Sequence, residues 1–112
     1  MTTIQRDGQY ATFINYFTVE PDKARPLADM LSAATAEVMC HIPGFISANI
    51  HLSTDHTRVV NYAQWATVEA FQAMLENPDA REHMSKCGEL ATSFEPRIYT
   101  VESVHPNPSA KR

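Results

Sequence analysis

Glycine is scarce in this chain, and its scarcity excludes two common kinds of site. The 112 residues include only three glycines, Gly8, Gly44 and Gly88, which lie far apart. A glycine-rich loop that cradles a dinucleotide or a phosphate cannot be built from them. The chain also lacks the glycine-flanked serine of a nucleophile elbow. The sequence therefore offers neither of these two motifs.

Basic residues and long apolar runs are scarce as well. Nine Lys and Arg residues against thirteen Asp and Glu residues give a formal net charge of −4 at pH 7, and no basic run occurs. This balance makes nucleic acid and anionic membranes poor partners. The apolar runs are too short to span a membrane, and the N-terminus has no signal-peptide core. We expect a cytoplasmic protein without a membrane segment.

The cysteines and histidines do not form a metal site in the sequence. Cys40 and Cys87 lie in helical patterns without the spacing of a disulfide framework, which favours reduced thiols. The five histidines show no metal-ligand spacing. His83 and Cys87 lie one helical turn apart, but such a pair alone is a weak metal signal. We expect no metal.

The hydrophobic pattern predicts an α+β domain. Four segments have the composition and alternation of strands: 10–19, 45–53, 58–65 and 94–104. Apolar stripes at helical spacing begin after three signals: Glu20-Pro21-Asp22, Thr67 and Asn77-Pro78. The order β-α-β-β-α-α-β is that of a ferredoxin-like fold with a four-stranded antiparallel sheet. We expect one domain over residues 1–105 and a flexible C-terminal tail over 106–112.

Short-range signals set several boundaries. Thr67 and Asn77 are good N-cap residues, each directly before a helical pattern. Residues 54–57 form the tight turn of a hairpin, in which His56 tolerates positive φ better than most residues. The first nine residues are polar, and we expect them to be loosely held.

Both faces of the predicted sheet carry apolar side chains. Asn15 and Phe17 share the face that the helices would cover, since side chains alternate along a strand. Ile14, Val60 and Tyr62 lie on the other face and need a second cover. Packing two such sheets face to face would provide it. We therefore predict a homodimer through the sheet faces.

Two polar side chains share one mostly apolar face of the third strand. Asn61, Ala63 and Trp65 point to the same side, and a buried carboxamide or indole N–H needs a hydrogen-bond partner. One interpretation is a strand amide bonded to a loop beside a core indole. The other is a polar pair that lines a pocket and binds a flat oxygenated ligand. Asn15, on a neighbouring strand, could join this pair or be a satisfied core amide.

The helices add further candidates for such a pocket. Phe71, Met74 and Met84 belong to apolar stripes, so they are most simply core residues that would double as a pocket wall. His83 stands beside Met84. It either borders the same cavity or is a half-exposed helix histidine.

Four segments carry a family resemblance. They are Phe-Ile-Asn-Tyr-Phe-Thr-Val, Pro-Gly-Phe-Ile-Ser-Ala-Asn-Ile-His, Val-Val-Asn-Tyr-Ala-Gln-Trp and Asn-Pro-Asp-Ala-Arg-Glu-His-Met. Together they resemble the antibiotic biosynthesis monooxygenase family, and the third, with Asn-Tyr-x-x-Trp on a strand, is the most specific. The resemblance covers about residues 10–105. It implies a dimeric α+β barrel with a pocket between the helices and the sheet of each monomer.

The resemblance also implies an activity. Characterised relatives include cofactor-independent monooxygenases that use O2 to convert anthrone- or naphthol-like polyketides to quinones. Asn61 and Trp65 would hold and polarise the substrate oxygen, and His83 is the candidate base. Asn15, Phe71, Met74 and Met84 would bind the small aromatic substrate. No cofactor would be needed, with O2 as the co-substrate.

Phe71 departs from the family pattern, and two alternatives stay open. A related quinone-forming enzyme carries a tyrosine where this chain has Phe71, which can stack on a ring but cannot hydrogen-bond. The family also includes haem-degrading enzymes that hold haem with an Asn, a Trp and a helix His. Asn15, Trp65 and His83 loosely echo that trio, although the spacing to the histidine matches poorly. The second alternative is a non-catalytic small-molecule binder on the same fold.

Overall fold

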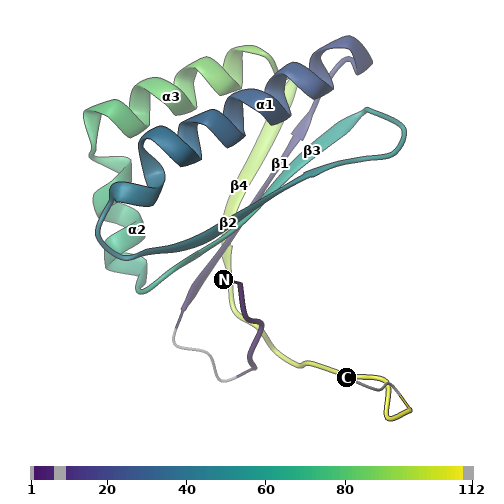
Figure 1. The fold of residues 1–112 in the computed structure, drawn as a ribbon, viewed down its shortest axis with the longest axis vertical. Coiled ribbons are helices and arrows are strands. Elements are labelled where there is room, and N and C mark those ends of the chain that lie inside the picture. The colour runs from purple at the N-terminus through teal and green to yellow at the C-terminus, as the bar shows by residue number, and fades with distance from the viewer. Residues whose placement is uncertain (1, 7–9, 110–112) are drawn as a thin grey trace.

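The computed structural model describes residues 2–6 and 10–109 and shows one sheet covered by helices (Figure 1). The strands are β1 (Ala11–Thr18), β2 (Phe45–Leu52), β3 (Arg58–Trp65) and β4 (Ser93–Tyr99). The helices are α1 (Pro21–Glu37), α2 (Val68–Leu75) and α3 (Pro78–Glu89), with a short 3-10 turn, η1, at Met39–His41. No helix in the described residues is long and apolar enough to cross a membrane.

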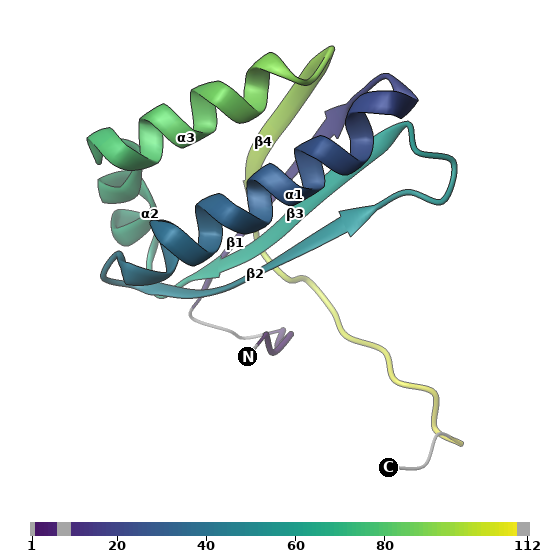
Figure 2. The ribbon, with the colours of Figure 1, turned by 45° about the horizontal axis from the view of Figure 1, so that its top comes forward.

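The sheet has the strand order β2-β3-β1-β4, and all neighbouring strands are antiparallel. Figure 2 shows the three helices together on one face, while the segments leading to both chain ends lie on the other side. This arrangement confirms the predicted ferredoxin-like α+β fold. It gives the sheet an inner face, toward the helices, and an outer face that no helix of the described residues covers.

Capping side chains fix where α2 and α3 begin. The Thr67 hydroxyl accepts a hydrogen bond from the backbone N–H of Ala70 at 3.0 Å. Asn77 Oδ1 accepts one from the backbone N–H of Ala80, also at 3.0 Å. Each bond satisfies a donor that the helix itself leaves free, so both predicted N-caps are confirmed.

The hairpin between β2 and β3 is held by its own turn. His56 has a φ of 62°, as expected for the residue that takes the left-handed conformation. The Asp55 carboxylate accepts hydrogen bonds from the Thr57 hydroxyl, the Ser53 hydroxyl and the Thr57 backbone N–H. These bonds favour the charged form and lower the pKa of Asp55 from 3.8 to about 2. A well-defined turn fixes the register, and therefore the face to which each β3 side chain points.

The apolar core of the inner face is divided into two clusters. One packs α1 over one end of the strands and consists of Phe17, Val19, Ala24, Leu27, Ala28, Leu31, Val59 and Cys87. The other lies under α2 and the start of α3 and consists of Ala11, Ala63, Trp65, Phe71, Met74 and Ala80. On β1 and β3, Asn15 and Asn61 stand between the two clusters. The centre of the inner face is therefore polar.

β4 is shorter than the sequence predicts. It ends at Tyr99 rather than near Val104. Among the described residues β4 pairs only with β1, and Tyr99 already pairs with Thr12 near the start of β1. Of the predicted tail 106–112, residues 106–109 are exposed, and 110–112 lie outside the described residues.

The N-terminal segment is not uniformly loose, and that expectation is wrong for Thr2 and Thr3. Thr2 Oγ1 donates a hydrogen bond to Ser47 Oγ at 2.6 Å. The Thr3 backbone N–H donates to Gln64 Oε1 at 3.3 Å, and Gln64 Nε2 donates to the Thr3 carbonyl at 2.6 Å. The buried carboxamide of Gln64 needs such partners, which explains the contact. Residues 1 and 7–9 lie outside the described residues.

Candidate functional site

Asn15 and Asn61 form a pair at the centre of the inner face. They stand opposite each other in the β1–β3 ladder, and the alternation of side chains places both on the helix side with Trp65. The same row continues to Ile50 on β2 and to Pro96 on β4. Neither of these neighbours has a side chain that can hydrogen-bond to a carboxamide.

The side-chain oxygens of this pair are buried without partners. Asn15 Oδ1 and Asn61 Oδ1 have no hydrogen bond to any residue that the structure describes. An unpaired polar atom in a protein interior costs about 1–3 kcal/mol. Two such atoms on adjacent strands make this place a candidate site, because a ligand or a water molecule there would supply the missing donors.

A cavity of about 760 Å³ lies over the pair, between the sheet and the helices. Figure 2 shows α1 and α3 running above the strands at this place, with α2 at one end. All seven residues singled out from the sequence line the cavity: Asn15, Asn61, Trp65, Phe71, Met74, His83 and Met84. The fold therefore gathers side chains from β1, β3, α2 and α3 around one space of ligand size.

Aromatic rings build one end of the cavity. Trp65 is only 2% exposed and meets Phe45 edge-on, with ring centroids 5.4 Å apart and an interplanar angle of 84°. It meets Phe71 in the same manner at 6.3 Å and 69°. Phe71 in turn tilts against Phe13 at 4.9 Å. These distances suit favourable aromatic contacts, so the rings form a stable apolar wall for a flat molecule.

α3 contributes His83, Met84 and Cys87 to the cavity. The sequence left the direction of His83 open, and the structure places this half-buried residue at the cavity. Burial raises the pKa of the Cys87 thiol from 9.0 to about 11, so the thiol stays protonated at neutral pH and is a poor nucleophile. Across residues 2–6 and 10–109, no group of three His, Cys, Asp or Glu side chains could hold a metal ion.

Sequence reasoning missed several residues that line the cavity. Phe13 and Phe17 share the inner face with Asn15, so the alternation along β1 already indicated them. Phe94 is different: it lines the cavity because it pairs with Phe17 across β1 and β4, and a strand sequence does not reveal its partner. Arg81, on α3, is exposed and lies at the margin of the cavity.

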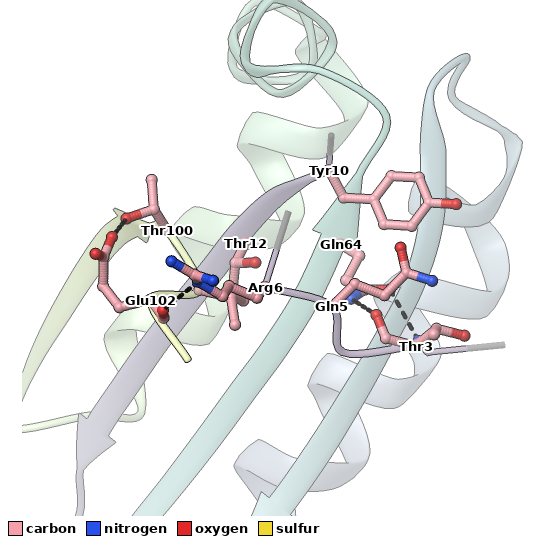
Figure 3. A pocket seen from close by; sticks show the side chains of 9 residues that line it. Thr3, Gln5, Arg6, Tyr10, Thr12, Gln64, Thr100 and Glu102 are labelled. Atoms are coloured by element: carbon pink, nitrogen blue, oxygen red, sulfur yellow. Dashed lines mark hydrogen bonds between the residues drawn. The ribbon is translucent and has the colours of Figure 1, made fainter. Parts of the chain in front are cut away.

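A smaller hollow of about 340 Å³ lies where residues 3–6 cross the sheet (Figure 3). Figure 3 shows the two bonds between Gln64 and Thr3, and Arg6 reaching toward Glu102. The Arg6 Nε–H donates to the Glu102 carbonyl at 3.2 Å. None of the residues predicted for the site lines this hollow, so the cavity of the inner face is the candidate site.

The fold and the cavity define an α+β protein with a cavity of ligand size, and comparison with known sequences gives its family. Residues 11–86 match the family described as antibiotic biosynthesis monooxygenase. A tetracenomycin-F1 monooxygenase of Streptomyces glaucescens is 42% identical over 87 residues, which make up 78% of this chain and 78% of that protein. The chain therefore belongs to the antibiotic biosynthesis monooxygenase family, and the prediction of a monooxygenase is confirmed at this level.

Solved structures share the fold. A monooxygenase from the gene ActVA-Orf6 of Streptomyces coelicolor, in complex with nanaomycin D, has a TM-score of 0.74 and 25% identity, covering 88% of this chain and 92% of that one. SnoaB from Streptomyces nogalater has a TM-score of 0.68 and 25% identity, covering 88% of this chain and 98% of that one. SnoaB is a cofactor-independent oxygenase, in agreement with the expectation that no cofactor takes part.

Proposed function

We propose that this enzyme is a cofactor-independent oxygenase that uses O2 to turn a phenolic, fused-ring aromatic into a quinone. The unpartnered oxygens of Asn15 and Asn61 carry the proposal, because a ligand rich in hydroxyl groups supplies the donors that they lack. Two relatives support it. One is a tetracenomycin-F1 monooxygenase, and the other holds nanaomycin D.

The divided core indicates how such a substrate would lie. The aromatic wall around Trp65 is at one end of the cavity, and Phe17 and Phe94 line the other. The pair of Asn15 and Asn61 stands between them. A linear fused-ring molecule therefore fits with its oxygen-bearing ring over the carboxamides and its outer rings against the aromatic ends.

In the proposed reaction the substrate itself, and not the protein, supplies the electrons. A deprotonated phenol is electron-rich and can reduce O2 itself. The ring carbon opposite the phenolate oxygen, which bears one hydrogen, then gains a hydroperoxide group, and loss of water leaves a carbonyl. One oxygen atom stays on carbon, while the other leaves as water with that hydrogen and the phenolic proton. The enzyme must exclude water and stabilise the developing oxyanion, roles that suit the N–H groups of Asn61 and Trp65.

The remaining residues have supporting roles in this proposal. His83 is the candidate base that accepts the phenolic proton. Asn15 helps to hold the oxygenated ring, and Phe71, Met74 and Met84 form apolar walls around it. Phe71 has no hydroxyl group, so a proton route through this position is closed, unlike in a relative with tyrosine there.

Oxygen uptake tests the proposed function. With a panel of anthrones and naphthols, we expect the enzyme to consume one O2 for each quinone formed. The Trp65→Phe variant keeps an aromatic ring but loses the N–H group, so its rate should fall about tenfold or more. Equal uptake by the two proteins would contradict the proposed role of Trp65. Ligand binding without uptake above the uncatalysed rate would favour the non-catalytic binder.

A haem titration tests the alternative of a haem-binding or haem-degrading protein. The proposed function predicts no Soret shift when haem is added. A shift that disappears in His83→Ala would instead support haem bound through His83, which lines the cavity with Asn15 and Trp65.

We further infer that the enzyme is a cytoplasmic homodimer, paired through the outer face of the sheet. This face carries half-buried Ile14, Val60 and Tyr62, and none of the helices in residues 2–6 and 10–109 covers it. Tyr99, at its edge, is 43% exposed. Sedimentation velocity should show a dimer that Val60→Asp dissociates, because the charge would be buried between two sheets. Gln72→Asp, on the exposed side of α2, is the matched control, and a monomeric wild type would contradict the dimer.

A further inference from the structure

The end of the cavity opposite Trp65 is built by the side chains of Phe17 and Phe94 and by the backbone of α3 at Gly88. Phe17 and Phe94 meet there with ring centroids 5.9 Å apart and an interplanar angle of 43°. Phe17 is 4% exposed, whereas Phe94 is 50% exposed. Gly88 on α3 lies over Phe94 and also lines the cavity. Phe94 therefore stands at the boundary between the cavity and solvent.

Because Gly88 has no side chain, the Phe94 ring can pack directly against α3. A Cβ atom at position 88 would lie 3.3 Å from Cε1 of Phe94, closer than most real contacts, and 3.7 Å from Cζ, an ordinary contact distance. The backbone does not require glycine here, because Gly88 lies in the last turn of α3 and Gly44 is the glycine with positive φ among the described residues. Glycine weakens a helix relative to alanine, so its presence at this position suits close packing of a ring.

We propose that the contact between Gly88 and Phe94 ends the cavity and sets how long a fused-ring ligand can be. Phe13 and Phe17 are four residues apart on β1, so the aromatic ends are about 13 Å apart along the strand. Asn15 lies midway and fixes the oxygenated ring. The number of rings beyond it then depends on the room between α3 and β4. This inference rests on the proposed function, whose substrate class it narrows.

Trp65 allows the proposal to be tested by binding alone. It is the only tryptophan of the chain and lines the cavity, so its fluorescence reports a bound ligand without turnover. The probes are a naphthol, an anthrone and a linear four-ring naphthacenone, each titrated anaerobically. The variants are Gly88→Ala and Phe94→Ala, with Glu89→Ala as the control on the exposed side of the same helix.

Gly88→Ala should weaken binding of the four-ring ligand about tenfold and leave the naphthol unaffected, because the added methyl group displaces the Phe94 ring and so alters the last part of the cavity. Its thermal unfolding should not occur at a lower temperature, since alanine favours the helix. Phe94→Ala should reduce the difference between the long and the short ligand. Glu89→Ala should behave as the wild type does.

The outcomes separate this proposal from the proposed function. If all variants show the wild-type ratio of dissociation constants, or if no probe quenches Trp65, the length limit is wrong. If the ratios change as expected but no protein consumes O2, the length limit stands and the oxygenase fails. If the enzyme consumes O2 but the ratios of dissociation constants do not change, the oxygenase stands and the length limit is wrong.

Discussion

Replacing Asn61 by alanine should slow oxygen uptake by about 100-fold or more, the usual effect of removing a donor to an oxyanion. The folded protein should not become less stable. Asn61 Oδ1 is buried without a partner in the described structure, so truncation removes an unsatisfied group rather than a bond. Initial rates in an oxygen electrode measure the uptake, and urea unfolding of the same preparations measures the free energy of unfolding.

Asn49 provides a matched control on the neighbouring strand. Its Nδ2 group donates to the Tyr62 carbonyl at 3.0 Å and to Thr2 Oγ1 at 2.5 Å. Asn49→Ala should therefore lower the free energy of unfolding by about 1–2 kcal/mol and leave the rate unchanged. If Asn61→Ala is instead less stable than the wild type but equally active, Asn61 is a structural residue and the proposed role fails.

Gly44→Ala should have the largest effect on stability. Gly44 has a φ of +89°, which an alanine adopts only with strain, and its Cβ would lie 2.4 Å from Cβ of Ala70. Strain and overpacking together should lower the free energy of unfolding by about 2–6 kcal/mol. α2, which contains both Ala70 and the cavity residue Phe71, must shift to make room. Urea unfolding measures the loss, and the anthrone Kd should rise with it.

A second substitution separates the two causes. Ala70→Gly in the Gly44→Ala background removes the clash and keeps the strained backbone. Part of the lost stability should therefore return, although glycine in α2 costs about 1 kcal/mol itself. A Gly44→Ala protein within about 0.5 kcal/mol of wild type would contradict both the backbone strain and the clash with α2.

The local and periodic features of the fold were predictable from the sequence. Thr67 and Asn77 signal helix starts by their chemistry, and His56 signals its backbone conformation. The alternation along β3 was enough to place Asn61 and Trp65 on one face. Each of these inferences depends on residues close together in the chain, where geometry follows from a fixed period.

Features that depend on distant pairing were not predictable. The opposition of Asn15 and Asn61 requires the register between β1 and β3, which no single strand contains. The distance between α3 and the sheet, and with it the cavity, depends on how several side chains pack together. The bonds from Thr3 to Gln64 were missed for the same reason, since 61 residues separate the partners.

The interruption of the core by two carboxamides has a consequence for how this protein tolerates change. Leucine at either position would join the two apolar clusters. It should raise the free energy of unfolding of the ligand-free protein and abolish the proposed activity. A computational redesign scored on folding energy alone would therefore replace the two carboxamides. Selection for a higher melting temperature, without a parallel screen for turnover, should enrich the same inactive variants.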